Sequence, residues 1–175
     1  MSFSKPLFLL QINHSMLKRK VLVNGISNLS DARYCAGMFV DYLSFELNSS
    51  HPDFIPIEKI LEIKNWLSGP KIGGRISQWP EELQESDWEK LALDFLIVNQ
   101  ETFKNKALAC VSEIFFELGK EDLNLNQFQH VLINADELNE KEINHLSIFV
   151  GPNVNIDTLD TLLDNGNVIG IALKG

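Results

Sequence analysis

Polar and charged side chains follow a series of short apolar segments, and their chemical types suit ligand binding or proton transfer. This set contains carboxylates, amides and two cations: Asn24, Glu46, Arg75, Asn99, Glu117, Asn134, Asn153 and Lys174. Carboxyl groups can act as general acids or bases, whereas carboxamides only donate and accept hydrogen bonds near neutral pH. The set predicts a site for a small polar molecule if the fold brings the segment ends together. The alternative is that strands become polar wherever they leave a core.

Glu46 and Glu117 are the most informative members of this set, because large apolar residues flank both of them. A carboxylate among such residues is costly to bury unless a cation pairs with it. If the two side chains point inward, Arg75 or Lys174 should neutralise them. If they point outward, they are ordinary solvated charges.

The segments that carry this set alternate with helical stretches, which is typical of parallel strands joined by crossover helices. Eight segments are predicted to be strands: Lys20–Gly25, Asp41–Leu47, Lys71–Ile76, Asp94–Asn99, Glu113–Leu118, His130–Ala135, Ser147–Gly151 and Val168–Leu173. Eight strands and seven helices fit a small closed (β/α)₈ barrel of the TIM type better than an open doubly wound sheet. In such a barrel the active site lies at the carboxyl ends of the strands, where the polar set falls.

The predicted barrel lacks an eighth helix, so something else must cover the outer face of its last and first strands. Residues 1–15 are expected to be an N-terminal extension to a single domain that spans residues 16–175. The apolar part of this extension, Phe3–Ile12, could lie on that face. A second subunit could cover it instead, which would make the protein a homodimer.

The composition argues against several classes of protein. Acidic residues outnumber basic ones by 24 to 15, and the basic residues form no stripe, so a nucleic-acid partner is not expected. No segment approaches the roughly 20 apolar residues that span a bilayer. The two cysteines form no framework or CxxC pair, which is typical of a reduced thiol in the cytoplasm. A soluble, cytoplasmic protein without a membrane partner is therefore expected.

Two weaker features could contribute to the same site. His51 lies in the loop after the second predicted strand and could face the barrel mouth, although a histidine on the surface of a loop is the commoner case. The pair Gly73-Gly74 could let a ligand approach the backbone closely. The four histidines match no metal-ligand spacing and no nucleotide-cofactor fingerprint is present, so neither a metal nor a cofactor is expected.

The segment Asn24–Ala32 resembles the opening motif of the phosphoribosylanthranilate isomerase family, which reads roughly K-x-C-G-(I/L)-(T/S)-x-x-x-D-A. Weaker similarity continues to Gly175, with the thinnest part in the middle of the chain. The resemblance implies a (β/α)₈ barrel whose relatives rearrange an N-glycoside of a phosphorylated ribose in tryptophan biosynthesis, without a cofactor. That isomerisation needs a general acid to open the sugar ring and a general base to move a proton.

The positions that the resemblance assigns to this reaction carry other residues here. The catalytic Cys and Asp of the family correspond to Asn24 and Asn134, and carboxamides cannot exchange these protons. A family Lys corresponds to Leu22, and an Arg that helps to hold the substrate falls at or near Asp53. The resemblance therefore predicts a degenerate barrel, or pseudoenzyme, that no longer performs the parent isomerisation.

The resemblance also implies a phosphate site on backbone amides after the seventh and eighth strands. Gly151, Lys174 and Gly175 could still attract an anion there, with Arg75 as another cation at the mouth, whereas Pro152 lacks an amide donor. The leading hypothesis is a degenerate barrel that binds a small metabolite, with or without a phosphate group, or a protein partner.

Two alternatives stay open. A sugar-phosphate isomerase could have recruited Asp136, Glu46 or Glu117 as its acid and base, since Asp136 stands two residues beyond Asn134. A structural subunit of an assembly is the other alternative, because fold alone does not determine function.

Overall fold

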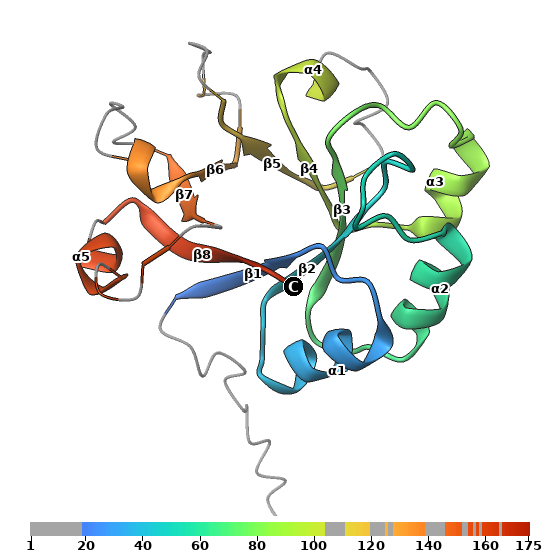
Figure 1. Cartoon of the computed structure of the whole chain (residues 1–175), viewed down its shortest axis with the longest axis horizontal. Helices are drawn as coiled ribbons and strands as arrows, with labels where there is room; N and C mark the ends of the chain where they lie inside the picture. The colour runs from blue at the N-terminus through green and yellow to red at the C-terminus, as the bar shows by residue number, and fades with distance from the viewer. Residues whose placement is uncertain are drawn as a thin grey trace, which may run out of the picture.

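Eight parallel strands form a closed barrel in sequence order (Figure 1). The computed structural model describes residues 19–103, 111–119, 125, 128–138, 146–151, 154–155, 157, 159–164 and 166–175. The strands are β1 (Lys20–Asn24), β2 (Tyr42–Glu46), β3 (Lys71–Ile76), β4 (Phe95–Val98), β5 (Glu113–Glu117), β6 (His130–Ile133), β7 (Ser147–Val150) and β8 (Val168–Lys174). β8 closes the barrel on β1, where Lys20 pairs with Gly170 and Asn24 with Lys174. The predicted TIM-type barrel and all eight strands are confirmed.

Helices lie on the outside of this barrel (Figure 1). Five α-helices occur in the described residues: α1 (Leu29–Gly37), α2 (Ile57–Asn65), α3 (Glu85–Leu91), α4 (Gln100–Phe103) and α5 (Leu159–Asp164). The connection between β5 and β6 falls largely outside the described residues. The described part of the next connection contains only a 3-10 turn, η3 (Ala135–Glu137).

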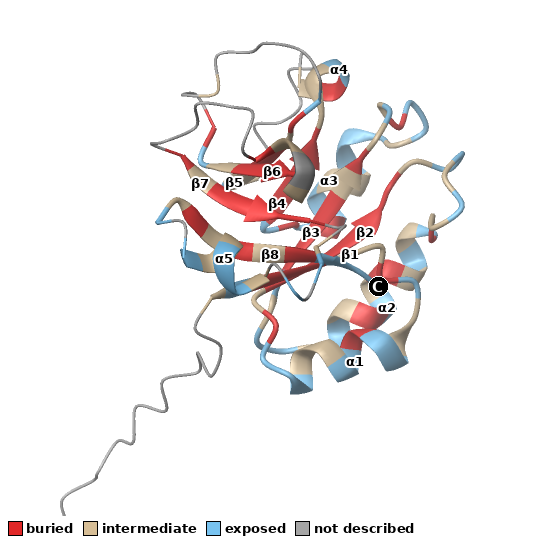
Figure 2. Ribbon diagram, turned by 60° about the vertical axis from the view of Figure 1, so that its left-hand side comes forward, coloured by how far each residue is buried: buried red, intermediate tan, exposed pale blue. Residues whose placement is uncertain are grey.

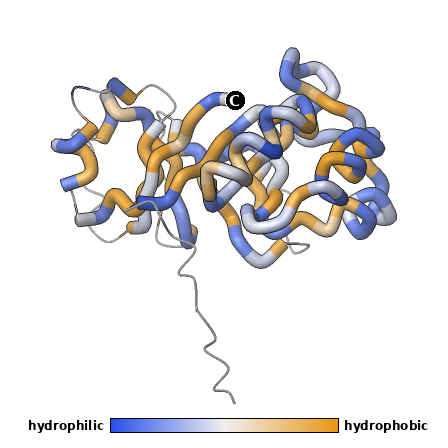
Figure 3. The backbone as a smooth tube through the Cα atoms, turned by 90° about the horizontal axis from the view of Figure 1, so that it is seen from below, coloured by the Kyte–Doolittle hydropathy of each residue, from blue (hydrophilic) through white to orange (hydrophobic). Residues whose placement is uncertain are grey.

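Local signals in the sequence explain how α1 and α2 begin and which face they bury. The Asn28 side chain accepts a hydrogen bond from the Asp31 amide at 2.9 Å, which caps α1. Pro56 stands directly before α2, whose Ile60 and Ile63 are buried. Hydrophobic and hydrophilic stretches alternate along the helices (Figure 3), as expected when only one helix face contacts the strands.

The hydrophobic core has two parts, one between the strands and the helices and one inside the barrel. Strand side chains point alternately outward and inward, so each strand contributes to both parts. The inner part consists of Leu22, Tyr42, Phe95, Ile97, Phe115, Leu132, Phe149 and Ala172. Its aromatic rings pack with centroids 5.0 to 5.8 Å apart. The middle of the barrel is therefore filled, and the inner core forms the floor of the space at the carboxyl ends of the strands.

The pair Gly73-Gly74 makes room for side chains, so the expectation that it admits a ligand was wrong. A Cβ atom on Gly73 would lie 2.4 Å from the ring of Phe95, and one on Gly74 would lie 2.4 Å from Leu47. Both distances are shorter than any real carbon contact. The large Phe95 ring lies inside the barrel directly beside position 73 of β3, which explains why that position is a glycine.

The outer face of β1 and β8 is mostly covered in this structure. Val21 and Val23 of β1 are buried in the outer core, Ile171 of β8 is half-buried, and Leu173 is 39% exposed. Figure 2 shows most of β1 as buried, whereas buried and half-buried residues alternate along the first part of β8. Residues 3–12, one of the two covers that the sequence suggested for this face, lie outside the described residues, so the choice between this segment and a second subunit stays a prediction. No helix in the described part of the chain is long and apolar enough to cross a membrane.

Candidate functional site

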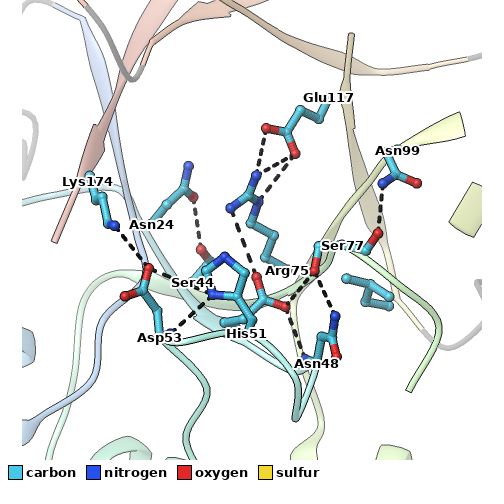
Figure 4. A network of polar contacts seen from close by, with 12 residues as sticks. Asn24, Ser44, Asn48, His51, Asp53, Arg75, Ser77, Asn99, Glu117 and Lys174 are labelled. Atoms are coloured by element: carbon cyan, nitrogen blue, oxygen red, sulfur yellow. Dashed lines mark hydrogen bonds and ion pairs between the residues drawn. The ribbon is translucent and has the colours of Figure 1, made fainter. Parts of the chain in front are cut away.

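A small cavity lies at the carboxyl ends of the strands, and we call it the mouth cavity. Seven polar or charged side chains line it together with Gly25 and Leu132: Asn24, Glu46, His51, Asp53, Arg75, Glu117 and Lys174 (Figure 4). Its volume is about 100 Å³. The barrel thus brings together five residues of the predicted polar set, which come from β1, β2, β3, β5 and β8.

Arg75 is the central cation of the mouth cavity. Its Nη2 atom donates to Oε1 of Glu117 at 2.8 Å and to Oε2 at 2.9 Å, and its Nη1 atom lies 4.0 Å from Oε2 of Glu46. Both carboxylates therefore point inward, which is one of the two alternatives that the sequence left open, and Arg75 lies between them. Because Glu117 engages the guanidinium with both oxygens, Arg75 is largely committed to this pair and is a weak candidate for holding a phosphate.

Glu46 is the most buried charged group of the cavity, with only 1% of its surface exposed. Its Oε1 atom accepts hydrogen bonds from the Asn48 amide at 3.0 Å and from the Ser77 hydroxyl at 3.4 Å. Its Oε2 atom is buried and has no hydrogen-bond partner among the residues that the structure describes. A buried acceptor without a donor is unfavourable, so a ligand that donates a hydrogen bond to Oε2 would remove this penalty.

Asn24 is held by a residue that the sequence prediction missed. The hydroxyl of Ser44 donates to Oδ1 of Asn24 at 2.9 Å, and Ser44 itself is fully buried. This bond leaves the Asn24 amide group as a donor toward the cavity. The signal for Ser44 was its spacing, because Tyr42, Ser44 and Glu46 are two residues apart and therefore share the inner face of β2.

Asp53 and His51 reach the cavity from the loop after β2. Nζ of Lys174 lies 3.2 Å from Oδ2 of Asp53, and Nδ1 of His51 accepts a hydrogen bond from the Asp53 amide at 3.1 Å. His51 therefore faces the mouth, which was the less expected alternative. Three carboxylates against two cations leave the cavity with a formal charge of −1.

The residues predicted to hold phosphate already have partners in the barrel. The Gly151 amide donates to the Ile133 carbonyl at 2.9 Å, and the Gly175 amide donates to the Asn24 carbonyl at 2.7 Å. A Cβ atom on Gly151 would lie 1.9 Å from the carbonyl oxygen of Ala172, so the close approach of β8 by itself requires glycine there. Lys174 is engaged with Asp53. The predicted phosphate donors are thus used for barrel closure and for an ion pair.

The remaining members of the predicted set lie elsewhere. Asn99 caps α4, because its Oδ1 atom accepts a hydrogen bond from the Thr102 amide at 2.9 Å, while its Nδ2 atom donates to the Ser77 carbonyl at 2.9 Å. Asn134 stands one residue past β6 at the start of η3 and does not line the mouth cavity. Asn153 and the side chain of Asp136 lie outside the described residues, so the role predicted for Asp136 stays a prediction.

Leu22, which the resemblance placed at the position of a Lys, belongs to the inner core and is fully buried. It contributes to the apolar floor beneath the mouth cavity and presents no charge to a ligand. Within the described part of the chain, no group of three or more His, Cys, Asp or Glu side chains is arranged to hold a metal ion.

Comparison with solved structures relates this barrel to phosphoribosylanthranilate isomerases. The chain is similar to the monomers generated from the dimeric phosphoribosylanthranilate isomerase of Thermotoga maritima, with a TM-score of 0.72 and 17% identity over 89% of this chain and 86% of that one. Another such isomerase, crystallised with reduced 1-(o-carboxyphenylamino)-1-deoxyribulose 5-phosphate, matches with a TM-score of 0.72 and 15% identity over 90% and 87% of the two chains.

A protein of another name has a similar fold. KGPDC from Streptococcus mutans matches with a TM-score of 0.57 and 15% identity over 89% of this chain and 87% of that one. No family model matches the sequence, and no curated protein matches it. The structural matches confirm the predicted resemblance at the level of the fold, whereas identities this low do not establish a shared activity.

Proposed function

We propose that this chain is a catalytically degenerate barrel of the phosphoribosylanthranilate isomerase type, which binds a small polar ligand in the mouth cavity without performing the isomerisation. The observation that carries this proposal is the state of Asn24. A carboxamide stands where the resemblance requires the base, and its oxygen is tied to the Ser44 hydroxyl at 2.9 Å. A carboxamide neither accepts nor releases a proton near neutral pH. This position therefore supports binding and not proton transfer.

The size of the mouth cavity supports the same conclusion. Pockets for drug-sized ligands usually enclose about 300–1,000 Å³. The mouth cavity encloses about 100 Å³, and the ion pair of Arg75 with Glu117 forms part of its lining. A molecule with a sugar, an aromatic ring and a phosphate would have to displace that pair. The ligand that fits the present geometry has only a few non-hydrogen atoms.

The charge of the cavity indicates which chemical groups the ligand carries. The unsatisfied Oε2 atom of Glu46 requires a donor, and the formal charge of −1 favours a neutral or cationic molecule. A hydroxyl or ammonium group meets both requirements. A phosphorylated ligand, which the sequence left open, is disfavoured because Gly151 and Gly175 use their amides elsewhere and Lys174 would have to leave Asp53.

Genetic complementation tests the loss of the isomerisation. The chain would be expressed in a bacterial strain that lacks phosphoribosylanthranilate isomerase, with a functional isomerase as the positive control and an immunoblot to verify that the chain accumulates. We expect no growth without tryptophan. Growth supported by the accumulated chain would overturn the proposal of degeneracy.

One observation favours the enzyme alternative. Within the described part of the chain no group donates a hydrogen bond to Glu46 Oε2, and a carboxylate oxygen without a donor is able to accept a proton from a substrate. In that case Glu46 would act as a recruited base, and a second group would have to act as the acid. Glu117 is poorly suited to that role, because both of its carboxylate oxygens already accept hydrogen bonds from Arg75. If the strain grows, Glu46→Gln should abolish that growth.

A further inference from the structure

A second and larger pocket lies at the opposite end of the barrel, and we call it the amino-terminal pocket. It encloses about 770 Å³ between the first residues of β1, β2 and β3 and the turns that follow α1 and α2. Lys20, Tyr42 and Lys71 line it from the strands, and Val40 and Pro70 line it from the turns. Its volume falls within the range of about 300–1,000 Å³ that is usual for organic ligands, so the pocket has room for several side chains.

The charged groups around the amino-terminal pocket balance one another. Two cations, Lys20 and Lys71, lie 5.6 and 5.7 Å from the centre of the Tyr42 ring. Lys71 forms an ion pair with Glu113, and the carboxylate of Asp41 lines the pocket together with Lys20. Burial is the largest of the causes that raise the pKa of Tyr42 to about 12, so its hydroxyl stays neutral. A pocket without net charge gives an ionic ligand no advantage over an apolar one.

Large apolar side chains are exposed beside this pocket. Tyr34, in the last turn of α1, and Met38, directly after that helix, are 70% and 53% exposed, and Trp66, directly after α2, is 67% exposed. The two helices lie side by side on the outside of the barrel (Figures 1 and 2), and the turns that follow them line the pocket. A group of large apolar side chains on the surface usually marks a contact site.

The chain contains an apolar segment of its own that could cover these side chains. Phe3–Leu10 holds five large apolar residues and a proline, and it has no acidic residue. Residues 1–18 contain two lysines and no acidic residue, whereas the whole chain has a net charge of −9. The segment is therefore apolar, and the small charge around it is opposite in sign to that of the rest of the chain.

The point of attachment of this segment favours the amino-terminal pocket over a more distant surface. The described chain begins at Arg19, and Lys20, the next residue, already lines the pocket. Residues 11–18 can span at most about 29 Å, which is enough for residues 3–10 to return to the pocket. A short tether gives a segment an effective concentration in the millimolar range. The tethered segment therefore has an advantage over a second copy or a free partner at a lower concentration.

We propose that Phe3–Leu10 of the same chain docks in the amino-terminal pocket and closes this end of the barrel. The sequence suggested the outer face of β1 and β8 for this segment, and the pocket is the alternative that the structure adds. The amino-terminal end of such barrels contributes to stability, so the docked segment stabilises the fold. The inference is independent of the function proposed for the mouth cavity, because the two sites share no residue.

Paramagnetic relaxation in the full chain tests where the segment lies. A nitroxide label is attached at position 11 through Gln11→Cys, in a chain whose own cysteines are replaced (Cys35→Ala and Cys110→Ala). We expect the label to broaden the amide signal of Gly69, which lines the pocket, more strongly than that of Val168. Val168 begins β8, which is paired with β1, so a segment that only extends from β1 would broaden Val168 at least as strongly.

A mixed sample separates docking within one chain from docking between two chains. Spin-labelled chains without ¹⁵N are mixed with ¹⁵N chains that carry no label, so any broadening then comes from another molecule. We expect the signal of Gly69 to stay sharp in this sample. Broadening of Gly69 there would assign the pocket to a second copy and overturn the proposal. The proposal is also overturned if the singly labelled chain broadens Val168 as strongly as Gly69.

Thermal unfolding measures what the docked segment contributes to stability. Phe8→Ser combined with Leu9→Ser removes two apolar side chains and should lower the Tm by about 4–8 °C. The same pair of changes should remove the selective broadening of Gly69. Gln11→Ser combined with Asn13→Ser alters only polar residues of the tether and should leave the Tm unchanged. A Tm equal to that of the wild type for Phe8→Ser with Leu9→Ser would contradict docking of the apolar segment.

Discussion

Arg75 on β3 reaches across β4 to Glu117 on β5, where Nη2 lies 2.8 Å from Oε1. The same guanidinium lies 4.0 Å from Glu46 on the other neighbouring strand, so three strand ends share one cation. All three side chains of this arrangement line the mouth cavity. Several properties of the protein should therefore depend on Arg75.

Replacing Arg75 with methionine should destabilise the protein, because Glu46 would be left buried without a cation. Removing one partner costs about 3–5 kcal/mol for a buried pair and about 0–1 kcal/mol for an exposed one. Glu117 is partly exposed, so we expect a loss of about 2–3 kcal/mol, measured by urea unfolding.

Two further variants serve as comparisons for the stability of Arg75→Met. Lys59→Met breaks the exposed pair with Glu62 and should cost less than about 1 kcal/mol. The double variant Arg75→Met with Glu46→Gln should be more stable than Arg75→Met alone, because it removes the uncompensated charge. Equal stability of Arg75→Met and Lys59→Met would contradict the role of Arg75 as the central cation.

Ethanolamine should bind the mouth cavity, because it joins an ammonium and a hydroxyl group within a few atoms and can donate to Glu46 Oε2. At about five times its Kd a ligand stabilises the folded state by about 1 kcal/mol, which raises the Tm by about 2–4 °C in a chain of this size. Differential scanning fluorimetry measures this shift. Glu46→Gln should abolish it, whereas Glu58→Gln, the same change on the exposed face of α2, should not.

Inorganic phosphate tests whether the mouth cavity prefers a neutral or cationic ligand or a phosphorylated one. Phosphate raises the Tm of many proteins by exclusion from their surface, so the comparison is made between the wild type and Lys174→Gln. We expect the same phosphate effect in both proteins. A larger rise in Tm for the wild type than for Lys174→Gln would show that Lys174 binds the anion. That result would favour a phosphorylated ligand for the mouth cavity.

Gly73→Ala should destabilise the barrel, because the new methyl group would lie 2.4 Å from the Phe95 ring inside it. Forcing an extra carbon into a filled core usually costs about 1–3 kcal/mol. Gly37→Ala at the end of α1 is the matched control, since no atom lies within 4 Å of its added carbon. Urea unfolding of the two variants and of Gly73→Ala with Phe95→Leu checks this assignment. The second change should restore part of the lost stability, and a fully stable Gly73→Ala would refute the packing argument.

His130 should make the stability depend on pH below neutrality. Burial against the rings of Phe115 and Phe149 lowers its pKa, although Glu113 partly opposes this effect. The unfolded chain therefore binds the proton at a higher pH than the folded chain. The stabilising contribution is complete above the unfolded pKa, near 6.5, and decreases as the pH falls below that value.

Urea unfolding at pH 7.5 and pH 5.5 measures this dependence. A single group changes the free energy of unfolding by at most about 1.4 kcal/mol for each pH unit. His130→Phe keeps the aromatic packing and removes the titrating group, so it should lose less stability than the wild type over this interval. An identical loss in both proteins would assign the pH dependence to other groups.

The eight strands and the barrel could be predicted from the chain itself, because their signals are local. Each strand is a short apolar run, and each run is separated from the next by a helical stretch or a turn. The sequence also predicted the inward orientation of the Glu46 and Glu117 side chains as one of two alternatives. A carboxylate among large apolar residues has few acceptable environments, and Arg75 was one of two candidate partners.

The tertiary structure decided which of these polar groups meet and how much space they leave. Arg75 and Glu117 are 42 positions apart, and only the order of strands in the closed barrel brings them together. The same closure uses the amides of Gly151 and Gly175, which the sequence had suggested for phosphate. It also turns His51 toward the mouth and makes Gly73 a requirement of packing. Such outcomes depend on distances between strands that are remote in the chain, and a local pattern of residue types does not contain those distances.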